Sequence, residues 1–241
     1  MRLAQYIALT GLSSRRAATR LIRDARITID GRVANHIDSI SLITTTHGIQ
    51  PVQHVCVDGQ SLAAIEAKEY WLFNKQVGTD CRLLPDDPSS LIHLLPRQPR
   101  LYPVGRLDKD SHGLLLLTND GYLTQQLMHP DYHHSKTYEV CLDSPFNDDF
   151  LNKMAAGVSY RSVLTKPCQT RRLSDTCFEI ILTQGLNRQI RRMSQALGYK
   201  VIDLKRIAIE SLQLGELPAG EMRPLTCAEE SSLKGLIKHQ T

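Results

Sequence analysis

Four consecutive leucines, Leu114 to Leu117, form the most distinctive apolar segment of the chain. Gly113 precedes them, and Asn119-Asp120-Gly121 follows shortly after them. A short apolar run between turn residues predicts a strand that is buried on both faces. Residues 105–112 are mostly polar, so a polar loop leads into this central strand. Such a loop is held in place by its strand and is a common location for catalytic side chains.

Helical spacing of apolar residues marks the beginning of the chain. Leu3, Tyr6 and Ile7 would share one face of a helix over residues 2–9, which Thr10-Gly11 ends. Ser13 or Ser14 would then cap a second helix that runs to about residue 24. Its two faces differ in chemistry. One is apolar, and the other carries Arg16, Arg20 and Arg23.

A β-hairpin is predicted to follow these helices. Residues 27–29 and 32–34 have strand character and are joined by Asp30-Gly31, a tight-turn pair. Residues 55–59 would add a further strand, and Thr44-Thr45-Thr46-His47-Gly48 is predicted to be a loop. Residues 61–68 then read as a linker to a larger region.

Strand and helix patterns alternate through residues 69–241. Strands are predicted at residues 70–74, 114–117, 136–142, 177–183, 201–204 and 207–209. Helices are predicted at residues 121–128, 147–156 and about 189–197, with a short helical turn near residue 91. Thr226 and Glu229 have the spacing of a capping box that starts a last helix. This mixture indicates an α+β fold.

Positive charge is concentrated in one segment. The whole chain of 241 residues has a net charge of +4, but residues 1–35 hold seven arginines and no lysine against two aspartates, a local charge of +5. Arginines without interspersed glutamates indicate a surface for polyanions rather than an ordinary solvated helix face. Two small helices and a hairpin suit the phosphates of a folded RNA.

Composition excludes several classes of protein. No apolar stretch approaches the length of a membrane span, and no signal-peptide pattern begins the chain. The six cysteines contain no C-x-x-C pair, so we expect reduced thiols, no disulfide framework and no zinc site. We therefore expect a cytoplasmic protein without a metal.

The polar loop carries the first recognisable motif. An isolated aspartate in such a loop is more often part of a surface turn than a catalytic group. Here, however, Gly105-Arg106-Leu107-Asp108, followed by Lys109-Asp110-Ser111-x-Gly113-Leu114, resembles the catalytic motif of the RsuA-like pseudouridine synthases, which isomerise uridine in ribosomal RNA. The resemblance implies that Asp108 is the catalytic carboxylate and that Arg106 fills the space left by an extruded base.

Two further motifs extend the resemblance. Lys136-x-Tyr138 resembles the segment in which a tyrosine packs against the target base, although a core tyrosine is the alternative reading. Gly185-x-Asn187-Arg188-Gln189-Ile190-Arg191-Arg192-Met193 resembles the third motif, which implies that Arg191 is the cationic partner of Asp108. The predicted substrate contacts are Arg106, Lys136, Ile190, Asn187 and Arg188. Lys75-Gln76-Val77-Gly78 stands where the family has Lys-Pro-x-Gly, and we assign Lys75 only turn or phosphate contacts.

The first 60 residues resemble the αL RNA-binding module of a ribosomal protein and of many RNA-modifying enzymes. The likeness is carried by Arg2-Leu3, Gly11-x-Ser13-Ser14-Arg15-Arg16-Ala17, Leu21-Ile22-Arg23 and Ile27-x-Ile29-Asp30-Gly31-x-Val33. It implies three parts: the module (1–60), the linker (61–68) and a catalytic domain (69–241) with a mixed, mainly antiparallel sheet. The predicted RNA-binding residues are Arg2, Arg15, Arg16, Arg20, Arg23 and Arg32.

A carboxylate can isomerise uridine without metal or cofactor. It can add to C1′ of the ribose or to C6 of the base, or deprotonate C2′, and the sequence does not choose among these routes. We expect a monomer that acts on ribosomal RNA, with the motifs closest to the branch specific for the large subunit (23S). Small-subunit RNA or a transfer RNA is the alternative substrate.

Two other functions remain open at this point. A non-catalytic RNA-binding ribosome-assembly factor would lack the carboxylate or its arginine, and both are present. A nucleosidase would need a second acid, for which Asp110 is the candidate.

Overall fold

The computed structural model describes residues 1–46 and 48–238. The chain divides into two compact units. The first contains residues 1–68 together with 96–101, and the second contains residues 69–95 and the chain from 102 onward. Within the first unit, the Arg100 backbone N–H donates to the Glu66 carboxylate at 3.1 Å, which ties the distant segment to residues 1–68.

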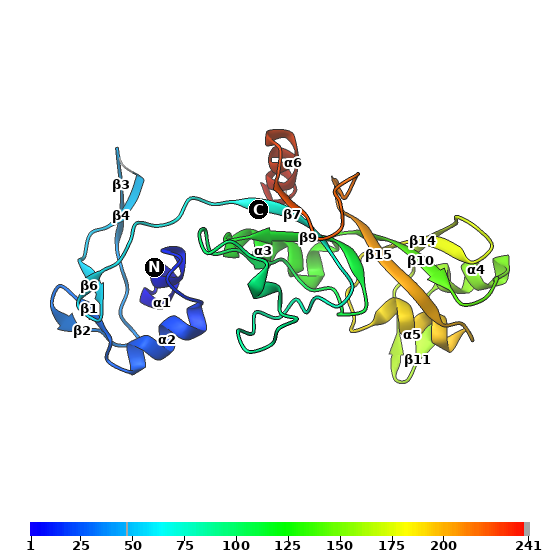
Figure 1. The fold of residues 1–241 in the computed structure, drawn as a ribbon, viewed down its shortest axis with the longest axis horizontal. Coiled ribbons are helices and arrows are strands. Elements are labelled where there is room, and N and C mark those ends of the chain that lie inside the picture. The colour runs from blue at the N-terminus through cyan, green and yellow to red at the C-terminus, as the bar shows by residue number, and fades with distance from the viewer. Residues whose placement is uncertain (47, 239–241) are drawn as a thin grey trace. The chain divides into compact units, whose positions relative to one another are not determined.

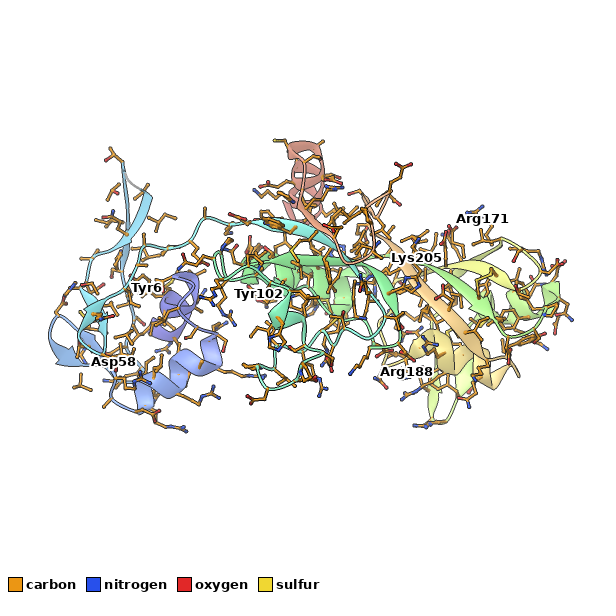
Figure 2. All side chains as sticks on the ribbon, viewed as in Figure 1. Tyr6, Asp58, Tyr102, Arg171, Arg188 and Lys205 are labelled. Atoms are coloured by element: carbon orange, nitrogen blue, oxygen red, sulfur yellow. A yellow bond between two sulfur atoms is a disulfide. The ribbon has the colours of Figure 1, made fainter. Side chains whose placement is uncertain are left out.

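The first unit places two helices beside a small sheet (Figure 1). Ser14 is the cap of the second helix, because its side chain accepts a hydrogen bond from the Ala17 N–H. Tyr6 is 2% exposed and anchors the core of this unit (Figure 2). The elements are α1 (Leu3–Leu9), α2 (Arg15–Arg23), β1 (Ile27–Ile29), β2 (Arg32–Val33), β5 (Val55–Val57) and β6 (Gln60–Ser61), with the sheet order β2-β1-β5-β6.

The loop predicted around residues 44–48 is instead a hairpin. Strands β3 (Leu42–Thr45) and β4 (Gly48–Pro51) pair with each other, and His47 lies outside the described residues. Leu42, Ile43 and Ile49 are compatible with strands, and threonine itself favours them. The prediction was wrong because the polar threonines were read as loop residues.

A single sheet organises the second unit and confirms the mixed, mainly antiparallel architecture. Its one parallel contact joins β15 to β9, which carries the four leucines (Figure 1). Strand order is β13 (Gln169–Arg172), β14 (Cys177–Leu182), β10 (Lys136–Leu142), β15 (Val201–Ile209), β9 (His112–Thr118), β7 (Tyr70–Lys75) and β17 (Met222–Pro224).

Two apolar clusters fill this unit. One joins Leu114 and Leu116 of β9 to helices α3 (Gly121–Met128) and α6 (Cys227–Lys238). The other joins β10, β14 and β15 to α4 (Asp148–Ala156) and α5 (Gln189–Ala196). All four leucines are fully buried, which confirms the predicted central strand. The capping box is also confirmed, since Thr226 and Glu229 exchange backbone-to-side-chain hydrogen bonds.

The two strands predicted at residues 201–209 form one strand. Lys205 and Arg206 separated the predicted strands, but Arg206 is buried in the continuous strand β15. Smaller elements complete the unit: η1 (Leu91–His93), β8 (Tyr102–Pro103), η2 (Pro130–Tyr132), β11 (Ser159–Tyr160), β12 (Val163–Leu164) and β16 (Leu212–Gln213). No helix of the described residues is long and apolar enough to cross a membrane.

Cys141 and Cys177 form a disulfide, contrary to the expectation of reduced thiols throughout. These cysteines are 36 residues apart in sequence, but they are directly opposed on the antiparallel strands β10 and β14. Opposed residues bring their Cβ atoms close together. Spacing along the sequence could not reveal this pairing, because it depends on strand register.

Candidate active site

A cleft of about 850 Å³ opens in the second unit. Its walls come from parts of the chain that are distant in sequence, among them residues 104–111, the start of β10, residues 182–190 and β15. The cleft thus collects all three sequence motifs in one place. The predicted site residues among its lining are Arg106, Asp108, Lys136, Tyr138, Asn187, Arg188 and Ile190.

Asp108 stands in a turn just before β9. The Ser111 N–H donates to the Asp108 carbonyl oxygen at 3.0 Å, which closes the turn. Leu107 is buried beside it, and its N–H donates to Cys81 Sγ at 3.4 Å. The carboxylate of Asp108 is half-buried, with a side chain 35% exposed. The neighbouring residues are therefore anchored while the carboxylate itself faces the cleft.

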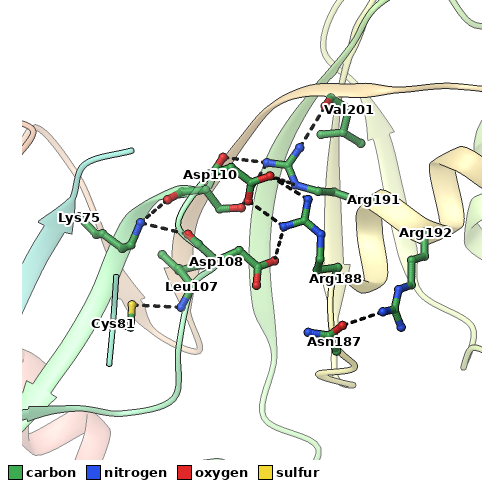
Figure 3. Close-up of polar contacts among 11 residues, drawn as sticks. Lys75, Cys81, Leu107, Asp108, Asp110, Asn187, Arg188, Arg191, Arg192 and Val201 are labelled. Atoms are coloured by element: carbon green, nitrogen blue, oxygen red, sulfur yellow. Dashed lines mark hydrogen bonds and ion pairs between the residues drawn. The ribbon is translucent and has the colours of Figure 1, made fainter. Parts of the chain in front are cut away.

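Lys75 holds this turn from one side. Its side chain is fully buried, and its Nζ donates to the carbonyl oxygens of Ser111 and Asp108 at 2.6 and 3.0 Å (Figure 3). It also donates to the Gln76 carbonyl oxygen at 3.0 Å. Burial lowers the pKa of the Lys75 ammonium. Three carbonyl acceptors match the three donors of an ammonium group. Lys75 therefore makes turn contacts, as expected, but they include the turn of Asp108, so Lys75 positions the backbone of that residue, which the sequence did not indicate.

Arg191 holds the turn from the opposite side. Its Nη2 donates to the Asp110 carbonyl oxygen at 2.8 Å and to Ser111 Oγ at 3.3 Å, while Nη1 donates to the Val201 carbonyl oxygen at 3.0 Å (Figure 3). Its Nε also lies 3.4 Å from the Asp110 carboxylate. This guanidinium joins α5, the turn and β15.

The cation paired with the Asp108 carboxylate is Arg188, not the predicted Arg191. Arg188 Nη1 lies 3.6 Å from Asp108 Oδ2, and the same guanidinium binds Asp110 in a bidentate pair at 2.9 and 2.8 Å (Figure 3). Arg191 instead donates to the carbonyl oxygens of Val201 and Asp110, and its Nε lies near the Asp110 carboxylate. The prediction rested on the resemblance of this segment to the family motif. The direction of each arginine side chain depends instead on its position relative to the start of α5, which Arg188 precedes and which contains Arg191.

The start of α5 determines that direction. Arg188 is the residue that precedes the helix, and it has a left-handed backbone with φ of 51°. Its hydrogen bonds to Asp110 lower the pKa of that carboxyl group and raise the pKa of the guanidinium. Asp110 is therefore ionised and paired with arginine. It is poorly suited to act as the second acid of a nucleosidase.

Tyr138 and Ile190 shape the apolar part of the cleft. Tyr138 stands on the central strand β10, and Ile190 is 4% exposed in the first turn of α5. Lys136, two residues before Tyr138, donates to the His134 carbonyl oxygen at 2.8 Å. Burial lowers the pKa of Lys136, and the nearby Arg206 lowers it further. An aromatic side chain beside an aliphatic wall can accept a planar base.

Arg106 and Asn187 lie at the exposed part of the lining. Arg106 is exposed and has no hydrogen bond or ion pair among the described residues. Asn187 Oδ1 accepts a hydrogen bond from Arg192 at 2.7 Å (Figure 3). Arg106 is thus the more available of the two for contact with a ligand.

Arg206 is a second buried cation that the sequence analysis did not select. It lies on β15 within the lining of the cleft and is 3% exposed. The available signal was a charged residue between the apolar segments of residues 201–204 and 207–209. Lys205 and Arg206 instead indicated a break between two strands.

The arginines predicted to bind RNA lie in the first unit. Arg15, Arg16, Arg20 and Arg23 are exposed on α2. Arg32 is paired with Asp38 at 3.0 and 3.1 Å, and Arg2 donates to the Ile37 carbonyl oxygen at 2.8 Å. The α2 arginines are therefore the more accessible group, and the one ion pair among their described side chains is the contact of Arg23 Nε with the Asp24 carboxylate at 3.9 Å. Within the described part of the chain, no group of three or more metal-ligating side chains could hold an ion.

Comparison with known proteins agrees with both units. The RNA pseudouridylate synthase family matches residues 69–196, and the S4 domain family matches residues 1–39. The chain is 36% identical to the dual-specificity RNA pseudouridine synthase RluF of Shigella flexneri, over 100% of this chain and 81% of the relative. It is 34% identical to the ribosomal small subunit pseudouridine synthase A of Escherichia coli K12, over 97% and 100% of the two chains.

A solved structure described as a pseudouridylate synthase extends this agreement to three dimensions. It superposes with a TM-score of 0.68 at 31% identity, covering 98% of this chain and 99% of that one. The similarity spans the S4 segment, the catalytic motifs and the sheet that carries them. The chain belongs to the RsuA-like family of RNA pseudouridine synthases, in which an S4 domain precedes the synthase domain.

Proposed function

We propose that this enzyme isomerises uridine to pseudouridine in ribosomal RNA, with Asp108 as the catalytic carboxylate. One observation carries the assignment of residues: Asp108 faces a cleft with its backbone anchored by Lys75 and its carboxylate 3.6 Å from Arg188. A carboxylate that is held in place beside a cation needs no reorganisation when a substrate displaces water. These are the requirements for attack on a nucleoside or for removal of its proton.

The target uridine must first leave its stack, which costs a few kcal/mol. Arg106 is exposed beside the turn of Asp108 and is the side chain placed to occupy the vacated space. The extruded uracil would pack against Tyr138, with Ile190 as the opposing wall. Lys136, Asn187 and Arg188 would contact the nucleotide around it.

Isomerisation then exchanges one bond for another. The C1′–N1 bond breaks, the base rotates, and a C1′–C5 bond forms. The proton on C5 is lost, and N1 gains one, so no atom is added or removed overall. Asp108 serves as the nucleophile or the base in this sequence, and Arg188 stabilises its charge. Arg191 acts as a positioning residue, since its contacts are to the turn rather than to the Asp108 carboxylate.

The first unit supplies affinity for the RNA. The exposed arginines of α2 are suited to phosphates, which position a nucleic acid without reading its sequence. Large-subunit RNA is the first substrate to test, because residues 105–113 and 183–193 resemble that branch. The small-subunit name of one relative makes small-subunit RNA a necessary comparison, and transfer RNA, the other alternative substrate, is tested beside it.

Tritium release provides the test. Unmodified transcripts of both ribosomal RNAs and of transfer RNAs, labelled at C5 of uridine, would be incubated with the enzyme. We expect tritium release from ribosomal RNA together with pseudouridine in the digested product. Free uracil would instead indicate a nucleosidase, and neither product from any RNA would contradict the proposal. Mapping the modified position then defines a short substrate.

A further inference from the structure

A buried arginine in the cleft has no role in the mechanism described so far. Arg206 is 3% exposed, and its Nε donates to the Leu114 carbonyl oxygen at 2.7 Å. Its Nη2 is buried and has no hydrogen-bond partner among residues 1–46 and 48–238. An unsatisfied buried donor on a charged group is costly. Such a group in a ligand cleft indicates a missing acceptor.

The position of Arg206 shows where that acceptor would be. Tyr138 of β10 and Arg206 of β15 are directly opposed in the antiparallel register. Opposed residues project from the same face of a sheet. Both also line the cleft. A planar group that packs against Tyr138 would therefore present its edge close to the Arg206 guanidinium.

The sheet holds Arg206 firmly relative to the Asp108 turn. Gly113 on β9 is paired with Arg206 across the parallel contact. A Cβ atom at Gly113 would lie 2.3 Å from the Arg206 carbonyl oxygen, and the φ of Gly113 is +99°. Only glycine permits this close approach. The close backbone contact therefore fixes the position of β9, which follows Asp108, relative to β15, which carries Arg206.

We propose that Arg206 binds a carbonyl oxygen of the extruded uracil and stabilises the negative charge that the ring carries during isomerisation. This proposal rests on the proposed function. When the C1′–N1 bond breaks, its electron pair remains with the base and is delocalised onto O2 and O4. The charge is discharged when C5 forms its bond to C1′, C5 loses its proton and N1 takes one up. A buried guanidinium is most effective against charge that develops in a dry site.

A uracil edge suits this site better than a phosphate. Arg206 is almost completely buried, whereas phosphates of an RNA strand would follow the outer surface, where Arg106 is exposed. Lys136 places a second cation nearby, and its pKa is lowered by burial and further by Arg206. Two neighbouring cations in one cleft are stabilised by a ligand that becomes negatively charged.

Substitution of single atoms in the RNA tests the contact. The substrate would be the short RNA defined by mapping, with uridine, 2-thiouridine or 4-thiouridine at the target position, since sulfur accepts hydrogen bonds weakly. Single-turnover rates would be compared for the wild type, Arg206→Met and Arg206→Lys. Arg171→Met is the control, because Arg171 is exposed and paired only with Glu179 (Figure 2).

We expect Arg206→Met to slow the uridine reaction by on the order of 100-fold with RNA affinity unchanged within a few-fold. The wild type should lose about 10- to 100-fold on one thio-substrate, and Arg206→Met should show no further loss on that substrate. Arg206→Lys should retain the fold and recover part of the rate.

Wild-type rates in Arg206→Met, or the same discrimination against thio-substrates in wild type and variant, would overturn the proposal. If Arg206→Met fails to fold, the same comparison is made with Arg206→Lys, where undiminished discrimination is the contrary outcome. Failure of the proposed function looks different, because the wild type would then form no pseudouridine even from uridine RNA.

Discussion

Arg188 lies 3.6 Å from the carboxylate of Asp108 while it binds Asp110 through both of its terminal nitrogens. A single guanidinium at the start of α5 thereby connects two carboxylates of one turn. Asp110 takes the bidentate contact, and Asp108 keeps its oxygens available to the cleft. The arrangement separates a structural carboxylate from a reactive one two residues away.

Replacement of Asp108 should abolish catalysis without abolishing binding. We expect Asp108→Asn to lower the rate of isomerisation by more than about 1,000-fold, since an amide cannot act as nucleophile or base. RNA affinity should stay within a few-fold, because it depends on many phosphate contacts. Tritium release and filter binding measure the two quantities, and the exposed Asp86→Asn is the control. Residual turnover above that limit would show that another group performs the chemistry.

The two arginines of α5 should respond differently to substitution. Arg188→Gln removes the cation beside Asp108, and we expect a 10- to 100-fold loss of rate with little change in stability, because its side chain is 40% exposed. Arg191→Lys cannot span the Val201 and Asp110 carbonyls, so both rate and stability should fall. Urea unfolding measures the stability of each variant and single-turnover experiments measure its rate, so the two together distinguish the two arginines. Equal loss of stability in both variants would contradict the division of roles.

Lys75 should matter for the fold of the turn more than for contact with RNA. Lys75→Met would leave the carbonyl oxygens of Gln76, Asp108 and Ser111 without this donor. We expect the free energy of unfolding to fall by about 2–4 kcal/mol, together with a reduced rate at unchanged RNA affinity. The exposed Lys153→Met, whose side chain is 58% exposed, is the matched control. Unchanged stability would mean that water replaces the ammonium without cost.

The exposed arginines of α2 should govern the salt dependence of RNA binding. Each phosphate contact contributes about 0.7 to 0.9 to the slope of log affinity against log salt. The triple variant Arg16→Gln, Arg20→Gln, Arg23→Gln should therefore reduce the slope by about two to three units. Arg26→Gln is the control in the same unit, because Arg26 already pairs with Asp58. Parallel salt plots would show that this helix face is merely solvated.

Glu229, near the start of α6, should make the free energy of unfolding depend on pH in the acidic range. Hydrogen bonds from Arg223 lower the pKa of Glu229 to about 2 from an ordinary value of 4.5. A depressed carboxyl pKa stabilises the folded state above the unfolded pKa, and this stabilisation disappears as pH falls from about 4.5 to 2. Glu229→Gln should cost about 1 kcal/mol at pH 7 and almost nothing at pH 2. Urea unfolding at both values checks this, with the exposed Glu221→Gln as control.

Local patterns were sufficient for much of the fold. The four leucines predicted β9, the capping box predicted the start of α6, and serine placement predicted α2. These elements depend on neighbours within a few residues, which a sequence displays directly. The hairpin at residues 42–51 was missed because threonine is common in both loops and strands.

By itself, the sequence determined the family, the α+β class and the motifs that meet in the cleft. Tertiary structure alone decided which cation faces Asp108, how Lys75 and Arg206 are used, and that Cys141 meets Cys177. These four results depend on strand register and on the direction of a side chain at a helix start. Both are set by packing between segments that are distant in the sequence. Cys141 and Cys177 are 36 residues apart, and Leu114 and Arg206 are 92 residues apart, so no local sequence pattern could predict these contacts.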